Sequence, residues 1–361
     1  MVGYDRGDFL KRLSILLCLL LAACSAPTDE PASTTTDETR YEKVEDIGYD
    51  TFDTVTKFAY YDDVGNGKEI VDLLHESMLY YHKLFDIYNA YDGINNAYTV
   101  NASPGEPVVV DEPLIELIEL AKKLYAETGE KANIAMGSML ALWHDARETK
   151  VDGHYVLPKP EALLESKKHM DLSKVVVDRE KRTVTITDPG VKLDLGAIAK
   201  GYAVERTAEA LEEAGAKNFI LSAGGDVRTA GNPPGRTGWK VGIQNPEHPL
   251  DQSSLLHVLT VGAPVSVVTS GDYQRYFEEN GVRYHHIIDP DTMEPSRLFS
   301  SVTIVHPDSA YGDFLSTALF LVPIEEGRKI ADRYDAAVLW ITPDGKETMN
   351  DRMKALLSET K

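Results

Sequence analysis

Residues 193–202 read LDLGAIAKGY and carry the most information about the fold of this chain. Alternating apolar residues at 191–195 predict a strand, and helical spacing begins after Gly196. Asp194 is therefore expected at a strand end and Lys200 in the first turns of a helix. A helix N-terminus attracts phosphate through its exposed N–H groups and its dipole, and a lysine adds a positive charge there. The stretch is interpreted as an anion-binding turn or as an ordinary strand-to-helix connection.

The N-terminus is typical of a bacterial secretion signal with a lipid-attachment site. Positive residues precede an apolar run at 13–21 that is too short to span a bilayer, and residues 21–24 read LAAC, which resembles a lipoprotein cleavage box. We expect removal of residues 1–23 and lipidation of Cys24. Since the second cysteine of the chain, Cys18, lies in the removed segment, the mature protein would hold no free thiol for a disulfide, thiolate catalysis or zinc binding.

Composition predicts a tether followed by one folded domain. Residues 24–46 are rich in Ser, Thr, Pro and acidic residues and have too few apolar groups to form a core. Residues 47–361 are the predicted domain. A formal charge of −21 makes nucleic acid and bare anionic membrane surfaces poor partners, and binding of a diphosphate would need a local basic group or a divalent cation.

Hydrophobic periodicity predicts an α+β fold with mixed and antiparallel sheets flanked by helices, since neither a repeat nor an uninterrupted strand–helix–strand alternation is present. Helical spacing occurs at residues 69–85, 113–128, 197–214, 311–321 and 324–334. Strands are expected at residues 183–187 and 191–195, as a hairpin, and at 218–222, 239–243, 255–261, 266–269, 282–288, 301–305 and 336–341. A loop is expected at residues 86–107.

Four further segments carry groups suited to a dinucleotide: SAGGDVR at 222–228, TSGDY at 269–273, YHHIIDP at 284–290 and DFLST at 313–317. In the last segment Asp313 and Thr317 are four residues apart on an expected helix, so their oxygens share one face. Taken singly, each segment also fits a structural role, such as a glycine turn, a half-buried histidine pair or a helix cap.

Taken together, in this order and at this spacing, the motifs resemble the ApbE family of FAD:protein FMN transferases from about Phe52 to Leu321. The most specific matches are LDLGAIAKGYAVE, AGGDVR, TSGDYQRYF with YHHIIDP, and DFLSTALF. The resemblance implies a T-fold-like domain that cleaves FAD between its phosphates, joins FMN through a phosphoester to a Thr or Ser of a target protein and releases AMP. It also implies magnesium as the metal ion, an extracytoplasmic flavoprotein as the acceptor and a lipid-anchored location outside the cytoplasmic membrane.

The resemblance also implies site residues. The magnesium ligands would be the backbone carbonyl of Ala197 and the side chains of Asp313 and Thr317. The FAD contacts would be Phe52, Tyr88, Ala132, Asn133, Ile134, Asp194, Lys200 and Ile287, with Lys200 at the phosphates.

His286 is the candidate general base for the acceptor hydroxyl, because the ordinary pKa of histidine suits proton transfer near neutral pH. Asp289 would orient His286 or lie nearer the metal. The alternative is a purely structural pair of His286 with Asp289.

The half expected to bind the flavin ring departs from the family pattern. Phe52-Asp53-Thr54 stands where most members have Met-Gly-Thr, and residues 132–139 lack a carboxylate and an aromatic residue of the usual motif. Phe52 can still cover a flavin ring, and Asn133 can bond its edge. Met293 replaces a glycine usual after the histidine motif.

Two other functions stay open: an FAD pyrophosphatase that uses water as the acceptor, and a lipoprotein that binds flavin or another solute without catalysis.

Overall fold

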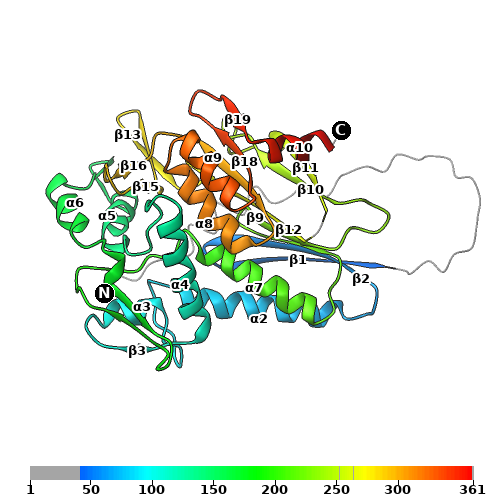
Figure 1. Ribbon diagram of the computed structural model, residues 1–361, viewed down its shortest axis with the longest axis horizontal. Coiled ribbons are helices and arrows are strands. Elements are labelled where there is room, and N and C mark those ends of the chain that lie inside the picture. The colour runs from blue at the N-terminus through cyan, green and yellow to red at the C-terminus, as the bar shows by residue number, and fades with distance from the viewer. Residues whose placement is uncertain (1–40, 252, 263, 360–361) are drawn as a thin grey trace, which may run out of the picture. The chain divides into compact units, whose positions relative to one another are not determined.

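The computed structural model describes residues 41–251, 253–262 and 264–359, and the folded unit begins at Tyr41. Its centre is an eight-stranded antiparallel sheet in the order β1-β2-β8-β9-β12-β17-β18-β19 (Figure 1). The strands of this sheet are β1 (Glu42–Thr51), β2 (Thr54–Asp62), β8 (Phe219–Ala223), β9 (Asp226–Ala230), β12 (Val265–Gly271), β17 (Ser301–His306), β18 (Ala337–Ile341) and β19 (Glu347–Met349).

Helices and small sheets surround this central sheet. The helices are α2 (Gly67–Phe85), α3 (Ala97–Ala102), α4 (Glu112–Glu127), α5 (Gly137–Glu148), α6 (Pro160–Lys167), α7 (Ala199–Glu213), α8 (Ser309–Phe320), α9 (Ile324–Arg333) and α10 (Asp351–Glu359). The small sheets are β3-β7-β6 (Val108–Val109, Thr183–Ile186, Val175–Asp178), β4-β5 (Lys150–Val151, His154–Tyr155), β10-β11 (Trp239–Gln244, Leu255–Val261), β13-β14 (Tyr276–Glu279, Val282–His285) and β15-β16 (Ile288–Asp289, Glu294–Pro295). The expected α+β class with antiparallel sheets is confirmed.

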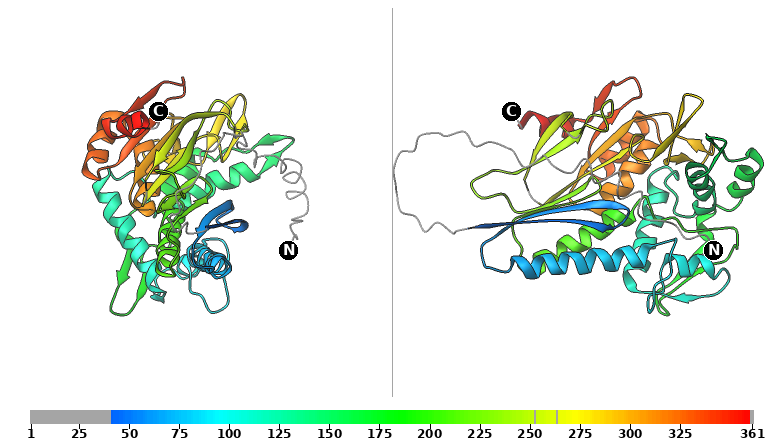
Figure 2. Two further views of the ribbon diagram at one scale, coloured as in Figure 1. Left: turned by 90° about the vertical axis from the view of Figure 1, so that its right-hand side faces the viewer. Right: turned by 180° about the vertical axis from the view of Figure 1, so that it is seen from behind.

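Both faces of the central sheet are covered, which explains why β18 (AVLWI) is apolar and buried at every position. In β18, Val338 and Trp340 belong to the core beneath α7 and α8, whereas Leu339 belongs to a second core beneath β10, β11 and α10. Alternate residues of a strand point to opposite faces, so a continuous apolar run fits a strand buried on both sides. Helices α2 and α7 lie side by side in the views of Figures 1 and 2.

The helices predicted from periodicity are confirmed with shifts of one or two residues at most of their ends, but several other predictions are wrong. Residues 191–195 are extended without forming a hairpin strand, because Asn101 bonds both the N–H and the carbonyl of Leu193, at 2.7 and 2.9 Å. Strand β7 pairs with β6 and β3 instead. The expected loop at 86–107 contains α3, and the expected strand at 282–288 is divided between β14 and β15.

The predicted tether at residues 24–46 also needs correction, because β1 begins at Glu42 and pairs with β2 along most of its length. The signal, Cys24 and the first part of the tether lie outside the described residues. Among the residues that the structure does describe, no helix combines the length and apolar character needed to cross a membrane.

Candidate active site

Three segments that are far apart in the sequence bring charged side chains together at the start of α7. Lys200, in the first turn of α7, forms an ion pair with Asp226 at the start of β9, and its Nζ lies 3.9 Å from Oδ1 of Asp313 on α8. Both carboxylates are buried. Burial alone would lower the pKa of Lys200, but the charges of Asp226 and Asp313 raise it, so the lysine stays an ammonium ion.

The two carboxylates outnumber the single lysine, so the cluster carries excess negative charge when both carboxylates are ionised. Burial and the nearby carboxylate of Asp313 raise the pKa of Asp226 to about 7, although Lys200 opposes the shift. Asp226 lies in the SAGGDVR motif, and the sequence alone predicts no role for this residue. Its position directly after two glycines at a strand start was the signal that could have found it.

Helix α7 approaches α8 closely because Gly201 has no side chain. A Cβ on Gly201 would lie 2.3 Å from the carbonyl oxygen of Ser309 and 2.4 Å from Cβ of Asp313, distances that no side chain tolerates. The close approach lets the N–H of Gly201 donate to Oδ2 of Asp313 at 2.7 Å. Asp313 is therefore held by one backbone bond on one oxygen and faces Lys200 with the other.

The carbonyl of Ala197 lies just before α7 and is available. Ala197 precedes the N-cap residue Ile198, and Gly201 is the third residue of the helix, whose N–H has no acceptor within the helix. This N–H bonds to Asp313, and continuous helical bonding begins with the bond from Tyr202 to Ile198. Among the described residues, no backbone N–H donates to the Ala197 carbonyl.

Hydroxyl groups border the cluster on α8 and β12. Thr317 lies one turn after Asp313, and its Oγ1 is 3.4 Å from Oγ of Ser270, which is 2.7 Å from Oγ of Ser316. Carboxylate, carbonyl and hydroxyl oxygens are the hard donors that magnesium prefers. The donor chemistry around Ala197, Asp313 and Thr317 therefore fits the expected magnesium ion.

The two adjacent histidines have different surroundings. The buried ring of His285 bonds with Nε2 to the carbonyl of Ser296 at 2.7 Å and accepts the N–H of Ile287 on Nδ1 at 3.2 Å, and burial lowers its pKa to about 4. His285 is therefore a neutral, structural residue. The side chain of His286 is exposed, while desolvation by the surrounding protein and the charge of Arg275 lower its pKa. The imidazole is therefore neutral and can accept a proton, but its pKa of about 3 makes it a weaker base than the ordinary histidine that the sequence predicts.

Asp289 has partners other than His286. Its Oδ1 accepts hydrogen bonds from Nζ of Lys131 at 3.2 Å and from the N–H of Asp291 at 2.9 Å. These contacts stabilise the turn that follows β15. The carboxylate of Asp289 therefore stabilises the fold of the histidine motif instead of making the expected orienting contact with His286.

A backbone bond connects several of the residues expected to hold the flavin to the opening motif. The N–H of Asp194 donates to the carbonyl of Ile134 at 2.8 Å, which places Ala132, Asn133 and Ile134 beside the opening motif. The side-chain amide of Asn133 donates to the Met170 carbonyl and accepts the Ala135 N–H, both at 2.8 Å, so the fold uses two of the four hydrogen bonds that this amide can make.

Aromatic side chains complete this part of the site. Phe52 has φ of 55° and packs edge-on against His82, with ring centroids 5.5 Å apart. Tyr88 is 58% exposed and lies with its ring centroid 5.5 Å from that of His144. An exposed aromatic ring offers a surface on which a flavin can stack.

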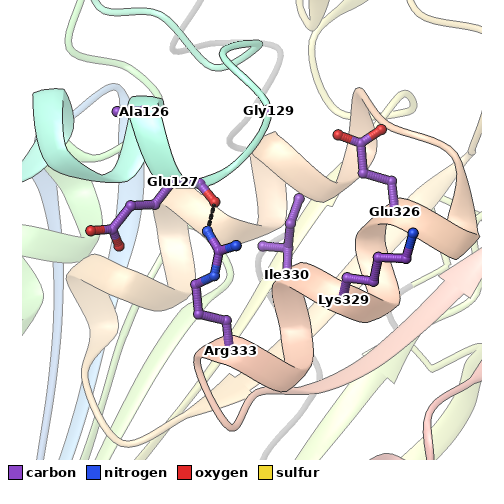
Figure 3. Close-up of a pocket in the computed structure, with 7 residues that line it drawn as sticks. All are labelled: Ala126, Glu127, Gly129, Glu326, Lys329, Ile330 and Arg333. Carbon is purple, nitrogen blue, oxygen red and sulfur yellow. Dashed lines mark hydrogen bonds between the residues drawn. The ribbon is translucent and has the colours of Figure 1, made fainter.

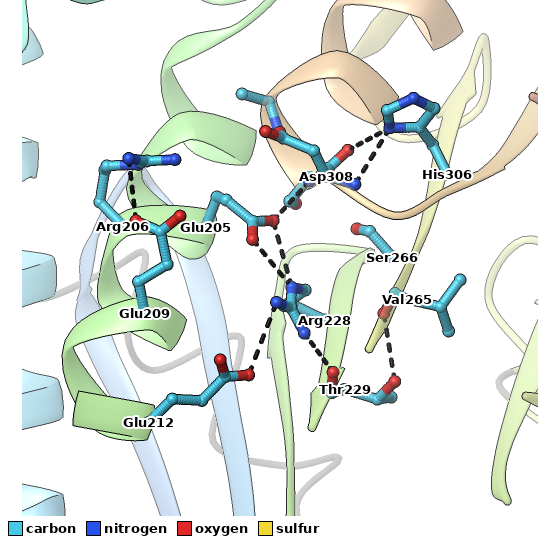
Figure 4. Close-up of polar contacts among 12 residues, drawn as sticks. Glu205, Arg206, Glu209, Glu212, Arg228, Thr229, Val265, Ser266, His306 and Asp308 are labelled. Carbon is cyan, nitrogen blue, oxygen red and sulfur yellow. Dashed lines mark hydrogen bonds and ion pairs between the residues drawn. The ribbon is translucent and has the colours of Figure 1, made fainter. Parts of the chain in front are cut away.

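A buried ion pair holds the elements of the charged cluster together (Figure 4). Nε of Arg228, on β9 two residues after Asp226, lies 3.1 Å from each carboxylate oxygen of Glu205 on α7. Oε2 of Glu205 also accepts the N–H of Ser309, the first residue of α8, at 2.6 Å. One carboxylate thus links the three elements that carry Lys200, Asp226 and Asp313.

A separate surface pocket opens between the end of α4 and α9, and Figure 3 shows Arg333 reaching across it to the carbonyl of Glu127. The pocket is lined by Ala126, Glu127, Gly129, Glu326, Lys329, Ile330 and Arg333. None of these residues was predicted as part of the site.

Comparison with known proteins matches residues 52–340 to the ApbE family. The FAD:protein FMN transferase of Treponema pallidum is 38% identical over 263 residues, which cover 68% of this chain and 70% of that protein. The enzyme of the same name from Klebsiella pneumoniae is 34% identical over 247 residues, covering 67% and 73% of the two chains. The crystal structure of the ApbE protein from Thermotoga maritima aligns with a TM-score of 0.75 at 30% identity, over 88% of this chain and 99% of the other. The flavin transferase ApbE from Vibrio cholerae also aligns with a TM-score of 0.75, at 26% identity, over 88% and 100%.

Proposed function

Because this chain belongs to the ApbE family, we propose that it is an FAD:protein FMN transferase. The observation that carries the proposal is the cluster of Lys200, Asp226 and Asp313 at the N-terminus of α7. A helix N-terminus with a lysine binds phosphate, and the excess of carboxylate and carbonyl oxygens suits a divalent cation. A diphosphate with a magnesium ion satisfies both halves of this arrangement.

In the proposed reaction a Thr or Ser hydroxyl of the acceptor attacks the phosphorus of the FMN half of FAD. A bond from the hydroxyl oxygen to this phosphorus forms, the bond from phosphorus to the bridging oxygen breaks, and AMP leaves with the bridging oxygen. The hydroxyl proton passes to the neutral imidazole of His286. Lys200 holds the diphosphate through its ammonium group and its backbone N–H at the start of α7, and stabilises the charge that develops on AMP.

The proposed magnesium ligands are the Ala197 carbonyl, the Asp313 carboxylate and the Thr317 hydroxyl. Magnesium supplies, when bound, neutralisation of the negative charge on the diphosphate. The carbonyl of Ala197, to which no described backbone N–H donates, and the partly free carboxylate of Asp313 support this assignment. We assign Phe52 and Tyr88 to the flavin ring, and the backbone near Ile134, Asp194 and Ile287 to the rest of the nucleotide.

We further propose that the protein is anchored through a lipid on Cys24 to the outer side of the cytoplasmic membrane, where it modifies an extracytoplasmic flavoprotein. The cleavage box at residues 21–24 supports this location. Incorporation of a labelled fatty acid into the wild-type chain, and its loss in a Cys24→Ala variant, would be the expected result. Labelling of both chains would contradict it.

The proposed activity is tested with purified protein, FAD, magnesium and an apo-flavoprotein domain that has a Thr acceptor. We expect the intact mass of the acceptor to increase by one FMN group with release of one AMP. Release of FMN and AMP at the same rate with or without acceptor, and without acceptor modification, would identify a pyrophosphatase instead. Flavin binding that needs no magnesium and produces no AMP would identify a solute-binding lipoprotein.

Asp313→Asn provides a matched variant, because the amide oxygen can still accept the N–H of Gly201 while the negative charge is removed. We expect FAD binding to persist and the transfer rate to fall about 10²–10³-fold, as is usual when one group that stabilises a transition state is lost. A normal rate at low magnesium concentration would exclude Asp313 as a ligand.

A further inference from the structure

Arg275 has a positively charged side chain to which the sequence motifs assign no role. It lies in the connection between β12 and β13, inside the TSGDYQRYF motif, and is exposed. Its guanidinium makes one long hydrogen bond, from Nη2 to the carbonyl of Phe52 at 3.4 Å. Among the described residues, no carboxylate oxygen lies within 4.0 Å of it, whereas Arg283 on the same hairpin contacts Asp272 and Glu278.

The surroundings of Arg275 are the residues proposed to hold the substrate. Its backbone carbonyl accepts the N–H of His286 at 3.2 Å, and its side chain reaches the backbone of Phe52. The positive charge of Arg275 favours lower pKa values for Asp194, His286 and Tyr88. At Asp194 and Tyr88 the effect of burial is stronger, so the pKa values of these two residues are raised overall. Arg275 therefore faces the same space as the candidate base and the proposed flavin contacts.

An arginine in this position is unusual for such an acidic chain. With 58 acidic and 37 basic residues, most arginines have a carboxylate available, yet Arg275 faces a site where Lys200 already carries a positive charge. Two cations that face one space repel each other unless an anion lies between them. Asp226 and Asp313 already neutralise the charge of Lys200 on the metal side. The positive charge that still needs an anionic partner is that of Arg275, on the side of His286.

We propose that Arg275 is a second phosphate-binding catalytic residue, which contacts the phosphoryl group that is transferred, opposite Lys200. The planar guanidinium can donate to two non-bridging oxygens of this group, a geometry that a lysine cannot reproduce. When the acceptor oxygen bonds to the phosphorus and the bond to the AMP oxygen breaks, negative charge on these oxygens is stabilised by the guanidinium. This inference rests on the proposed function. It assigns Arg275 to the phosphoryl group that is transferred and Lys200 to the phosphate that leaves with AMP.

The test compares Arg275→Gln, Arg275→Lys and Arg283→Gln in the full chain, with FAD, magnesium and the apo-acceptor domain. We expect Arg275→Gln to reduce kcat for AMP release about 10²–10³-fold, with a change in the KM for FAD below about tenfold, because the contact strengthens as charge develops. Arg275→Lys should recover only a small part of kcat, since the bidentate contact is absent. Arg283→Gln is the control for the hairpin and is expected to retain kcat.

Each outcome decides the assignment. A kcat of Arg275→Gln within about threefold of the wild type would overturn it. An equal loss in Arg275→Gln and Arg283→Gln, with less unfolding free energy in both, would place the effect in the hairpin fold and would also overturn it. If the wild-type chain bound FAD but released no AMP, the proposed function would fail. The FAD affinity of Arg275→Gln, measured by flavin fluorescence, would then still show whether the guanidinium binds the nucleotide.

Discussion

Single residues set the geometry of the charged cluster, and Gly201 has the greatest influence among them. Its missing side chain allows the contact of α7 with α8, and its N–H fixes one oxygen of Asp313. A glycine in a helix normally lowers stability relative to alanine. At this position the close packing of two helices reverses that preference.

We therefore predict that Gly201→Ala lowers the free energy of unfolding by about 1–3 kcal/mol, the usual cost of overpacking a tight contact. It should also weaken magnesium-dependent AMP release, because α8 must move away from α7. Urea unfolding and the AMP assay provide the measurements. Gly196→Ala is the stability control, since its Cβ would have one neighbour at 3.1 Å, the side-chain oxygen of Asp194. Equal stability of Gly201→Ala and the wild type would contradict the packing argument.

At the level of elements, the buried pair of Glu205 with Arg228 ties α7 and β9 to the start of α8. Removing the charge of Glu205 leaves the guanidinium of Arg228 without its buried carboxylate partner, so Glu205→Gln should lower the free energy of unfolding by about 3–5 kcal/mol. Glu212→Gln is the matched control. Glu212 lies 3.6 Å from the same arginine but its side chain is 39% exposed, so a cost below about 1 kcal/mol is expected. Similar losses in both variants would disprove the special role of Glu205.

A second prediction concerns the turn between β2 and α2, where the carboxylate of Asp62 accepts the N–H groups of Val64, Gly65 and Gly67 at 2.7–2.8 Å. Burial opposes ionisation, but these bonds outweigh it and lower the pKa of Asp62 below its ordinary 3.8. A lowered pKa in the folded state stabilises the fold above the unfolded-state pKa, and this stability is lost as the pH falls through the folded-state pKa.

Asp62→Asn should therefore reduce the free energy of unfolding by about 1–3 kcal/mol at pH 7, and the difference from the wild type should shrink as the pH falls below about 3.8. Denaturant titrations at several pH values measure this difference. Asp72→Asn removes an exposed carboxylate that pairs with Lys68, so it serves as the control and should have little effect. A difference that stays constant down to pH 2 would contradict the charge-based explanation.

Sequence predicts elements well where the chain itself supplies the pattern. Helices α2, α4, α8 and α9 follow from apolar spacing, because each buries one continuous face or is buried all round. Residues 191–195 alternate like a strand, but their backbone bonds to the side chain of Asn101, far away in the sequence. No local pattern encodes such a partner, and this is why the hairpin prediction failed.

At the scale of the whole molecule, the candidate site joins α7, α8 and β9 to the histidine motif and to the connection after β12. The motifs identified Lys200, Asp313 and His286 because each of these residues lies within a short, continuous motif of the sequence. The motifs could not show that Asp289 binds Lys131, that the amide of Asn133 is used by the fold, or that Arg275 has no acidic partner within the part of the chain that the structure describes. These facts depend on tertiary neighbours, which a single sequence does not reveal.

Since the proposed ligands meet only in the folded chain, we predict that FAD and magnesium together raise the free energy of unfolding by about 2.7 kcal/mol at a free FAD concentration one hundred times its Kd. Thermal unfolding with FAD alone, with magnesium alone and with both would measure this effect. In Asp313→Ala the additional stabilisation by magnesium should disappear while that by FAD alone remains. Stabilisation by magnesium that is equal in the two proteins would place the ion elsewhere.

The bond from Gly201 to Asp313 also bears on how this chemistry can be transplanted. The N–H of Gly201 holds the carboxylate of Asp313, so one bond between helices brings a proposed ligand on α8 to the turn that carries the carbonyl of Ala197. A synthetic peptide of residues 193–205 would lack this carboxylate and would form little helix in water. Grafting the opening motif onto another scaffold would therefore transfer a phosphate-binding turn without a metal site, unless the facing turn of α8 were grafted with it.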